Sequence, residues 1–308
     1  MEEKFSLIKK DFLEKWIFAM QQAGISPIDY NPQIRLINDA NSDYSIGIMF
    51  NPRRFERSKP KAEDSAGCRL CAELKNSEEN SFKNLAPNIS ENFLITYNPF
   101  PHTIGSSMAL AKNKDGKEKP MYDTKNLSRL VIELDEVFKI AEKLGLKVFH
   151  NTFGAGATIP SHEHWHLLNL NSAYDTLGVM YGFDAAEKVD SKKLKGVQIM
   201  PDFPFAHLIF DSSNPEPIVH FLKNLGTALG KDYPYGHIPH SICQGQKGVL
   251  ITPNKIHRDR CIGSPEIAGH YLGCKSQEEF ENITYNDYIS KIDEILFRKE
   301  DINLEMFL

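Results

Sequence analysis

Residues 150–166 read His-Asn-Thr-Phe-Gly-Ala-Gly-Ala-Thr-Ile-Pro-Ser-His-Glu-His-Trp-His, a stretch that carries four of the eleven histidines of the chain. Aromatic and branched residues dominate the segment 163–170, and neither Gly nor Pro interrupts it, which predicts a strand. Because side chains alternate along a strand, we expect His162, His164 and His166 on one face, about 6–7 Å apart. A patterned trio of this kind indicates a metal site or a nucleophile with helpers, and the alternative is a surface histidine cluster.

A glycine-containing loop precedes this predicted strand. Gly154 and Gly156 let the backbone approach a ligand closely, and the exposed amides of such a loop suit phosphate oxygens. The central imidazole, His164, can attack phosphorus and hold a nucleotidyl group as a phosphoramidate. Two or three of the histidines can instead bind one metal ion. The spacing alone leaves both chemistries open.

Composition excludes several classes of protein. The chain has 308 residues, of which 41% are hydrophobic and 25% charged, a length that allows one large domain or two fused halves. A net charge of -5, from 36 basic and 41 acidic residues, argues against nucleic-acid partners. No apolar run reaches the ~20 residues of a membrane span, and the N-terminus lacks a secretory signal. Five thinly spread cysteines favour reduced thiols, so we expect a cytoplasmic protein without membrane or nucleic-acid partners.

Clusters of predicted strands alternate with single helices along the chain. Apolar residues at helical spacing predict amphipathic helices at 4–23 and 124–144. Strands are predicted at 33–37, 44–51, 93–97, 107–112, 147–151, 163–170, 196–200, 207–211, 239–243 and 248–252, and further helices at 217–229, 277–282 and 288–298. This order favours an α+β or mixed α/β fold, and its partial repetition after residue 169 suggests two related halves.

A second candidate feature is the pair Cys68-x-x-Cys71. Two thiolates at this spacing form half of a tetrahedral zinc site, and the remaining ligands must come from elsewhere in the chain. His162, His102 and His150 are the candidates. The alternative is a buried thiol pair or a redox couple.

A third candidate is the basic loop that follows the strand predicted at 44–51. Arg53, Arg54 and Arg57 lie between two prolines, and their guanidinium groups suit the phosphate of a nucleotide or a sugar phosphate. The alternative interpretation is a solvated run of charge.

Taken in this order, the three features resemble the histidine-triad (HIT) superfamily, in its branch of galactose-1-phosphate uridylyltransferase and the dinucleotide and nucleotide-sugar phosphorylases. The hallmark of the branch, His-x-His-x-Gln after a loop that begins with Asn, is similar to the run from Asn151 to His166. The resemblance implies that His164 is the nucleophile and that His162 is a zinc ligand. It also implies that Cys68 and Cys71 bind the same zinc ion.

The same resemblance implies which residues bind the nucleotide. Arg54 and Arg57 match arginines that follow a Ser-Pro pair in the uridylyltransferases, which makes them phosphate contacts. Asn98 matches the Asn of the nucleoside-binding loop, and Asn151 the Asn before the glycine loop with Gly154. In the second half, 238–240, 249–253 and 266–270 are similar to segments of the GDP-hexose phosphorylases.

From the resemblance we expect an α+β fold, with a HIT-like antiparallel sheet, flanking helices and two fused halves. The expected units are an N-terminal helix and lead-in (1–43), a catalytic half (44–170), and a second half with the C-terminal helices (171–308). The expected activity is nucleotidyl transfer or phosphorolysis on a nucleoside diphosphate sugar or a related nucleotide pyrophosphate, with phosphate or a sugar phosphate as acceptor. The expected cofactor is a structural zinc ion.

Two departures from the family pattern keep alternatives open. His166 occupies the position of the usual Gln, and because an imidazole can donate a proton to the leaving group, this favours hydrolysis of nucleotide pyrophosphates as an alternative activity. The segment 113–123 lacks the histidine that the family uses as a fourth zinc ligand, so His102 is a candidate substitute. A nucleotide-binding protein without turnover is a further alternative. Nothing in the sequence specifies a base, a sugar or an oligomeric state.

Overall fold

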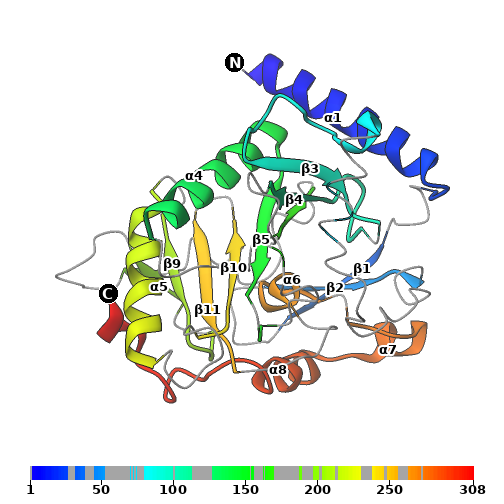
Figure 1. Ribbon diagram of the computed structural model, residues 1–308. Helices are drawn as coiled ribbons and strands as arrows, with labels where there is room; N and C mark the ends of the chain where they lie inside the picture. The colour runs from blue at the N-terminus through cyan, green and yellow to red at the C-terminus, as the bar shows by residue number, and fades with distance from the viewer. Residues whose placement is uncertain are drawn as a thin grey trace.

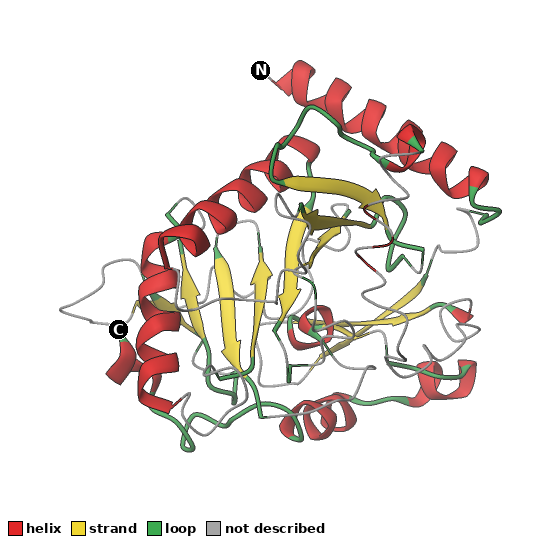
Figure 2. Cartoon of the chain, viewed as in Figure 1, coloured by secondary structure: helices red, strands yellow, loops and turns green. Residues whose placement is uncertain are grey.

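We analysed a computed structural model of the chain. It describes residues 2–26, 32–38, 45–52, 70, 72, 74, 80–99, 101–112, 127–152, 154–155, 162, 164–169, 187–188, 197–200, 203–211, 214–229, 238–245, 248–255, 263–271 and 273–308. The described residues form a nine-stranded and a three-stranded sheet, with helices packed around them (Figures 1 and 2).

The large sheet is built from two copies of one motif, in which two strands, a helix and two further strands follow each other. Its strand order is β3-β4-β6-β5-β10-β11-β9-β8-β7, and every pairing is antiparallel. The first copy comprises β3 (Phe93–Tyr97), β4 (Ser107–Ala111), α4 (Leu127–Leu144), β5 (Lys147–Asn151) and β6 (His164–Leu168). The second comprises β8 (Gln198–Ile199), β9 (Leu208–Phe210), α5 (Glu216–Leu229), β10 (His240–Gln244) and β11 (Val249–Pro253), and β7 (Glu187–Lys188) extends the edge. This arrangement agrees with the predicted pair of fused halves, whereas the predicted unit boundaries stay a prediction.

The two halves meet where β5 pairs with β10. His150 lies opposite Ile242, and Asn151 lies opposite Ser241. A two-fold axis through the His150–Ile242 pair exchanges the halves, because it also carries β6 onto β11 and β4 onto β9 in the strand order. The sheet is therefore symmetric about this seam, although the two sequences share no motif.

The register shows which positions of the second half correspond to the histidines of the first. Phe149 is paired with His166 in the first half, and the equivalent pair in the second half is Ser241 with Thr252. Thr252 therefore occupies the position of His166, and two residues earlier Leu250 occupies that of His164. Leu250 is buried and has no reactive group, so the second half repeats the scaffold of the first but not its imidazoles.

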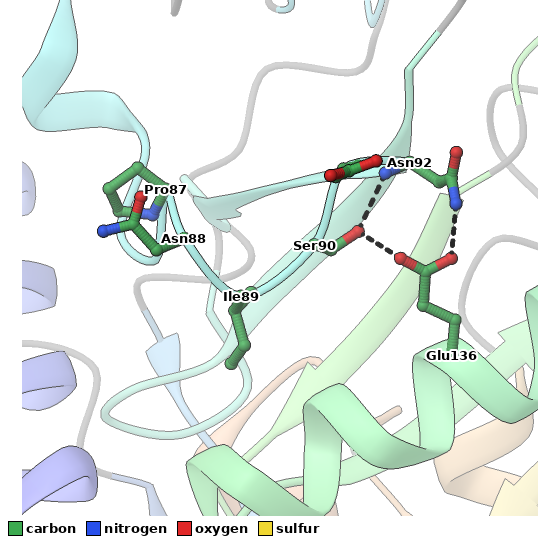
Figure 3. Close-up of a pocket in the computed structure, with 7 residues that line it drawn as sticks. Pro87, Asn88, Ile89, Ser90, Asn92 and Glu136 are labelled. Carbon is green, nitrogen blue, oxygen red and sulfur yellow. Dashed lines mark hydrogen bonds between the residues drawn. The ribbon is translucent and has the colours of Figure 1, made fainter.

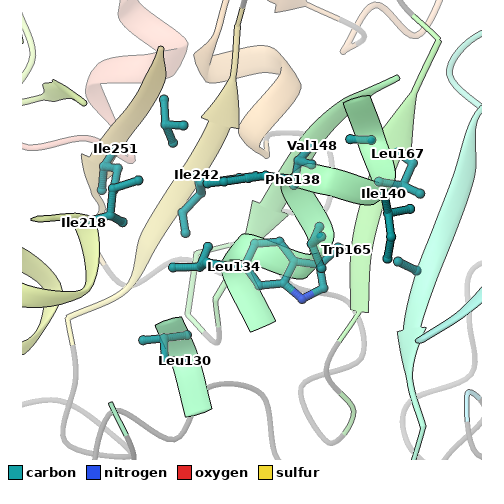
Figure 4. Packing of buried hydrophobic residues seen from close by; sticks show 14 of the residues in the cluster. Leu130, Leu134, Phe138, Ile140, Val148, Trp165, Leu167, Ile218, Ile242 and Ile251 are labelled. Atoms are coloured by element: carbon teal, nitrogen blue, oxygen red, sulfur yellow. The ribbon is translucent and has the colours of Figure 1, made fainter. Parts of the chain in front are cut away.

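One face of the large sheet is covered by helices. The side chains of α4 and α5 pack against alternate residues of β5, β6, β10 and β11 (Figure 4). The helix α1 (Glu2–Gln22) covers the end of the sheet near β3 (Figure 1). Trp165 is fully buried in this core, beside Leu134 and Val148. Because β6 turns Trp165 and Leu167 toward the helices, it must turn His164 and His166 toward the opposite face.

The opposite face of the large sheet is covered by the smaller sheet and by three helices. The smaller sheet has the order β1 (Gln33–Asn38), β2 (Ser45–Phe50) and β12 (His270–Tyr271), and the helices are α6 (Ser264–Ile267), α7 (Gln277–Asn282) and α8 (Tyr285–Asp293). They bury a second apolar cluster that includes Phe149, Leu168 and Leu250 of the large sheet. Short 3-10 helices lie at Ser81–Lys83 and Leu304–Phe307.

Within the described part of the chain, no helix has both the length and the apolar character that crossing a membrane requires.

Candidate active site

His164 and His166 lie on β6, on the face of the large sheet that α4 and α5 do not cover. His164 is opposite Leu110 of β4, and His166 lies between Met108 of β4 and Phe149 of β5. Leu110 and Met108 belong to a small apolar cluster, and Phe149 belongs to the larger one beneath the second sheet. The two imidazoles therefore lie between two apolar clusters on the same face.

His162 precedes β6 (His164–Leu168) in the sequence. The side chain of His162 is fully buried, and its Nε2 lies 3.1 Å from the carbonyl oxygen of Ala111 at the end of β4. A carbonyl can only accept, so Nε2 carries the proton and a metal ion would bind Nδ1. The expectation that His162 shares one face with His164 and His166 stays a prediction.

The main-chain carbonyl of His162 fixes the tautomer of His164. Its oxygen lies 2.9 Å from His164 Nδ1, and because it can only accept, Nδ1 donates the hydrogen. The lone pair of the neutral ring is then on Nε2. Burial lowers the pKa of His164 by disfavouring the imidazolium, and the nearby His162 acts in the same direction, while the bond to the His162 carbonyl opposes them. The result is a neutral, oriented imidazole whose Nε2 can act as a nucleophile.

His166 is part of a row of three rings. Its ring centroid lies 5.5 Å from that of His164 and 6.0 Å from that of His102, and both contacts are edge-to-face. His166 and His102 are half-buried, so they lie nearer to solvent than His164 does. His102 therefore lies beside the last histidine of the motif. The expectation that His102 and His162 share a zinc ion stays a prediction.

The loop between β3 and β4, which carries Asn98 and His102, is fixed to the end of β6. Asn169 accepts a hydrogen bond from Thr103 Oγ1 through its carbonyl (3.0 Å) and donates from Nδ2 to the carbonyl of Ile104 (2.9 Å). Gly105 has φ +86°, and a Cβ there would clash with α1 and with Asn169, so the turn requires glycine. Asn98 closes the loop by donating from its main-chain nitrogen to Ser106, and its side chain is buried.

The turn after β5 places a second set of polar groups at the opposite end of these strands, beside the start of β6. Asn151 is the last residue of β5, and Thr152 bonds to the carbonyl of His240 through both its main-chain nitrogen (3.1 Å) and its Oγ1 (3.0 Å). Gly154 adopts φ +82° in a turn closed by a bond from the nitrogen of Ala155 to Thr152. This left-handed conformation is the physical reason for a glycine at this position. Gly156 lies outside the described residues.

His150 lies on the helix-side face of the sheet, opposite to the face of His164 and His166, and its place among the candidate zinc ligands stays a prediction. Its ring stacks on Trp165 at 4.0 Å in the helix-side core. Its Nδ1 donates to the carbonyl oxygen of His164 at 3.0 Å. Burial, followed by the charge of nearby imidazoles, lowers the pKa of His150 well below its usual value, so the ring is neutral. His150 therefore stabilises β6 from the helix-side face of the sheet, through its hydrogen bond to the His164 carbonyl.

A separate hollow of about 490 Å³ lies between the lead-in to β3 and α4 (Figure 3). Its wall includes Glu136, which accepts hydrogen bonds from Ser90 Oγ (2.6 Å) and Asn92 Nδ2 (2.8 Å). None of the residues that the sequence predicts for the site lines this hollow, and its carboxylates would repel phosphate. We therefore do not assign the nucleotide to it.

Five of the predicted site residues lie outside the described residues: Arg54, Arg57, Cys68, Cys71 and Gly156. Leu70 and Leu74 are described, and they pack with Leu94 of β3 and Leu110 of β4. The contact with Leu110 places Leu70 and Leu74 against β4, the strand whose last carbonyl contacts His162.

Sequence reasoning missed the polar residues of the second half that surround Asn151. Ser241 and Asn254 are buried and linked to the Asn151 side chain through hydrogen bonds, and the main chain of Ser264 joins them. No motif signals these residues, because they belong to ordinary strand and loop sequences. Only the pairing of β5 with β10 brings them to the site.

By sequence, the chain matches no known protein family and none of the curated proteins. By structure, it resembles yeast Ap4A phosphorylase Apa2, with a TM-score of 0.63 and 13% identity over 93% of this chain and 92% of that chain. The structure of that protein in complex with Ap4A gives a TM-score of 0.62 at 12% identity, covering 94% and 95% of the two chains, and its complex with AMP gives 0.60 at 12%, covering 93% and 94%. Identity this low shows a shared fold, and the likeness spans nearly the whole of both chains. The predicted fold class, an α+β arrangement with a HIT-like antiparallel sheet and flanking helices, is confirmed.

Proposed function

We propose that the protein is an enzyme that transfers a nucleotidyl group from a nucleotide pyrophosphate through a covalent intermediate on His164. The observation that supports this most directly is the hydrogen bond from His164 Nδ1 to the His162 carbonyl. It holds a neutral imidazole with the lone pair on Nε2, which is what attack on phosphorus requires.

The reaction has two displacements. In the first, the Nε2 lone pair forms a P–N bond to the nucleotidyl phosphorus, and the bond from that phosphorus to the bridging oxygen breaks. The departing phosphate takes the bridging oxygen with its electron pair. In the second, an oxygen of the acceptor attacks the same phosphorus, the P–N bond breaks, and the electron pair returns to Nε2. Dividing the transfer in this way replaces one difficult displacement by two easier ones.

The residues around His164 have distinct roles in this proposal. His166 lies beside the nucleophile and would donate a proton or a hydrogen bond to the leaving oxygen. Arg54 and Arg57, with main-chain amides near Gly154 and Gly156, would offset the charge that develops on the phosphoryl oxygens. Asn98 and Asn151 would bind the nucleotide.

For the substrate, we propose a nucleoside diphosphate sugar or a related nucleotide pyrophosphate, with phosphate or a sugar phosphate as acceptor. Segments of the second half that resemble GDP-hexose phosphorylases support the sugar. The shared fold with an Ap4A phosphorylase supports the related pyrophosphate, a dinucleoside polyphosphate, as the substrate to compare with it. Both present the same chemistry to His164, a nucleotidyl phosphorus bound to a phosphate leaving group. The thinly spread cysteines support a cytoplasmic setting.

We further propose a structural zinc ion held by Cys68, Cys71 and Nδ1 of His162. The bond from His162 Nε2 to Ala111 fits this assignment, because it orients the ring and fixes its tautomer. When bound, zinc would hold rigid the residue whose carbonyl orients His164. Within the described residues no three His, Cys, Asp or Glu side chains group as a metal site, and the two cysteines lie outside those residues.

The direct test is to incubate the protein with UDP-hexose, GDP-hexose or Ap4A without acceptor and measure its intact mass. A nucleotidyl adduct that maps to His164, and that phosphate discharges as a nucleoside diphosphate, supports the proposal. A His164→Ala variant should form no adduct and lose turnover. Full turnover by this variant would rule out the covalent mechanism, and nucleotide-dependent thermal stabilisation without any product would indicate a binding protein.

Hydrolysis of nucleotide pyrophosphates is the second candidate activity, and the contact between the rings of His166 and His102 favours it. Two adjacent imidazoles can exchange a proton with the leaving group or with water, whereas a Gln at position 166 cannot titrate. Product formation that is equally fast with and without added phosphate would identify a hydrolase. A strict requirement for phosphate would identify a phosphorylase.

A further inference from the structure

The side chain of Asn151 is held by two hydrogen bonds to its carboxamide oxygen. The main-chain nitrogen of Ser264, at the start of α6, donates to Oδ1 at 2.7 Å. Ser241 Oγ on the neighbouring strand β10 is 3.0 Å from the same atom. Both partners belong to the second half of the chain, about 90 and 113 positions away in sequence.

These contacts determine which way the carboxamide faces. A main-chain N–H can only donate, so the atom facing Ser264 must be the oxygen, and the two possible amide orientations are not equivalent. Asn151 Nδ2 therefore lies on the other side, with two N–H donors. Within the described part of the chain no residue accepts a hydrogen bond from this nitrogen, and the side chain is half-buried. Asn151 thus presents donors alone.

A buried chain of hydrogen bonds leads to Asn151 from the second half. Thr252 Oγ1 donates to Asn254 Oδ1 (3.4 Å), and Asn254 Nδ2 donates to Ser241 Oγ (3.1 Å). Because Asn254 Nδ2 is a donor, Ser241 accepts there and uses its own hydrogen for Asn151. All three side chains are fully buried. The donors therefore all point in one direction, toward the Asn151 oxygen.

The segment that begins α6 is fixed just as firmly. Cys243 Sγ donates to the carbonyl of Ser264 at 3.1 Å, and the nitrogen of Gly263 donates to Glu266 Oε2 at 2.8 Å. A Cβ at Gly263 would lie 2.7 Å from Asn151 Nδ2, closer than van der Waals contact allows. Because Gly263 has no side chain, the Asn151 amide can occupy this space.

The register shows what the presented donors can reach. β5 and β6 are paired as far as Phe149 and His166, and two residues beyond that pair Asn151 comes opposite His164 on the same face. An acceptor within reach of Asn151 is therefore next to the atom that His164 attacks. An oxygen of that phosphoryl group can accept a hydrogen bond from Asn151 Nδ2. In the opposite amide orientation Asn151 would present its own oxygen there instead.

We propose that Ser241, Asn254 and the Gly263–Ser264 main chain are positioning residues, through which the second half aims the Asn151 amide at an oxygen of the bound nucleotide. This assignment rests on the proposed function, because the nucleotide is the one that His164 attacks. It gives the second half a role in the reaction, although Leu250 and Thr252 occupy the positions equivalent to His164 and His166.

The test compares Ser241→Ala, Ser241→Thr, Gly263→Ala and Asn151→Asp with a matched control. Ser241→Ala removes one of the two orienting donors, so kcat should fall about tenfold, with a smaller change in KM. Ser241→Thr keeps the hydroxyl and should restore kcat. Gly263→Ala should lower kcat at least as much, because the added methyl displaces Nδ2. The control is Ser90→Ala, which removes a hydroxyl of comparable hydrogen bonding at the separate hollow and should leave kcat unchanged.

Asn151→Asp tests the role of the Asn151 N–H donors separately from any effect on folding. A carboxylate still accepts from Ser264 and Ser241, but it replaces the N–H donors with an oxygen that repels phosphate. Thermal unfolding without nucleotide should therefore be nearly unchanged, while the stabilisation by AMP, GMP or UMP is lost.

The outcomes separate the two proposals. If wild-type protein forms the His164 adduct and Ser241→Ala and Gly263→Ala form it at the wild-type rate, the positioning role is wrong and the proposed function stands. If no adduct forms but a nucleoside monophosphate stabilises wild type and not Asn151→Asp, the proposed chemistry is wrong, whereas the proposed role of the Asn151 amide in binding the nucleotide is supported. If no nucleotide binds wild type, both are wrong.

Discussion

Replacing His150 with phenylalanine tests whether this residue stabilises the position of His164 from the opposite face of the sheet. The ring of His150 stacks on Trp165, and its Nδ1 donates to the carbonyl of His164. The pairing of β5 with β6 ends at Phe149 and His166, and beyond it the imidazole takes the place of a main-chain donor. Phenylalanine preserves the volume and the stacking but removes this donor.

The expected cost follows from what the substitution leaves behind. A buried carbonyl that loses its donor costs about 1–3 kcal/mol, so His150→Phe should lower the free energy of unfolding by that amount. His150→Ala also removes a buried ring and leaves a cavity, which raises the expected loss to about 3–5 kcal/mol. Because the freed carbonyl belongs to His164, the proposed nucleophile should also shift, and kcat should fall about tenfold or more.

Urea unfolding followed by circular dichroism at pH 7 gives the free energy, and the rate of adduct formation on His164 gives the activity. Ile218→Val is the control, since it removes one methyl group from the helix-side core on α5 and should cost about 1 kcal/mol with no change in kcat. If His150→Phe unfolds at the wild-type urea concentration and keeps the wild-type rate, the hydrogen bond to His164 does not support the strand.

Three further predictions concern other parts of the chain. Burial lowers the pKa of His207 to about 4, so on acidification the unfolded state binds a proton at a higher pH than the folded state does. The neutral His207 therefore contributes fully to the free energy of unfolding above about pH 6.5, and about 3 kcal/mol is lost as the pH falls through 4. Urea midpoints between pH 7 and 4.5 should therefore fall more steeply for wild type than for His207→Asn, and parallel curves would contradict the assignment. His166→Gln should raise the ratio of phosphorolysis to hydrolysis, measured as nucleoside diphosphate against monophosphate, because Gln cannot donate a titratable proton; an unchanged ratio would remove His166 from proton transfer. Lys291 donates to Glu279 (2.6 Å) and to Tyr271 (2.8 Å), but it is partly exposed, so Lys291→Met should cost only about 1 kcal/mol in thermal unfolding, and no loss at all would show the pair to be fully screened.

Local periodicity predicts most of the elements because each is decided by its own residues. The helix expected at 4–23 is Glu2–Gln22, and its stripe of Phe12, Trp16 and Met20 is buried. The strand expected at 163–170 is observed as His164–Leu168 among the described residues.

The candidate site is less predictable, because part of it depends on contacts between distant segments. The alternation of His164 and His166 follows from the strand itself and could be predicted. The opposite placement of His150 also follows from strand alternation, but only once β5 is aligned with β6. The link from Asn254 through Ser241 to Asn151 needs the pairing of β5 with β10, and no local pattern in the sequence determines which edges meet.

The seam between β5 and β10 has a consequence for dissecting the chain. A fragment that ends near residue 170 would leave the outer edge of β5 with unpaired main-chain groups, in a fragment that still has its own helix-side core. The β5 edge of a second fragment can pair with this edge, because β10, which pairs with β5 in the full chain, is related to β5 by a two-fold rotation. Such fragments should associate in pairs through this edge, and each pair would carry two copies of His164.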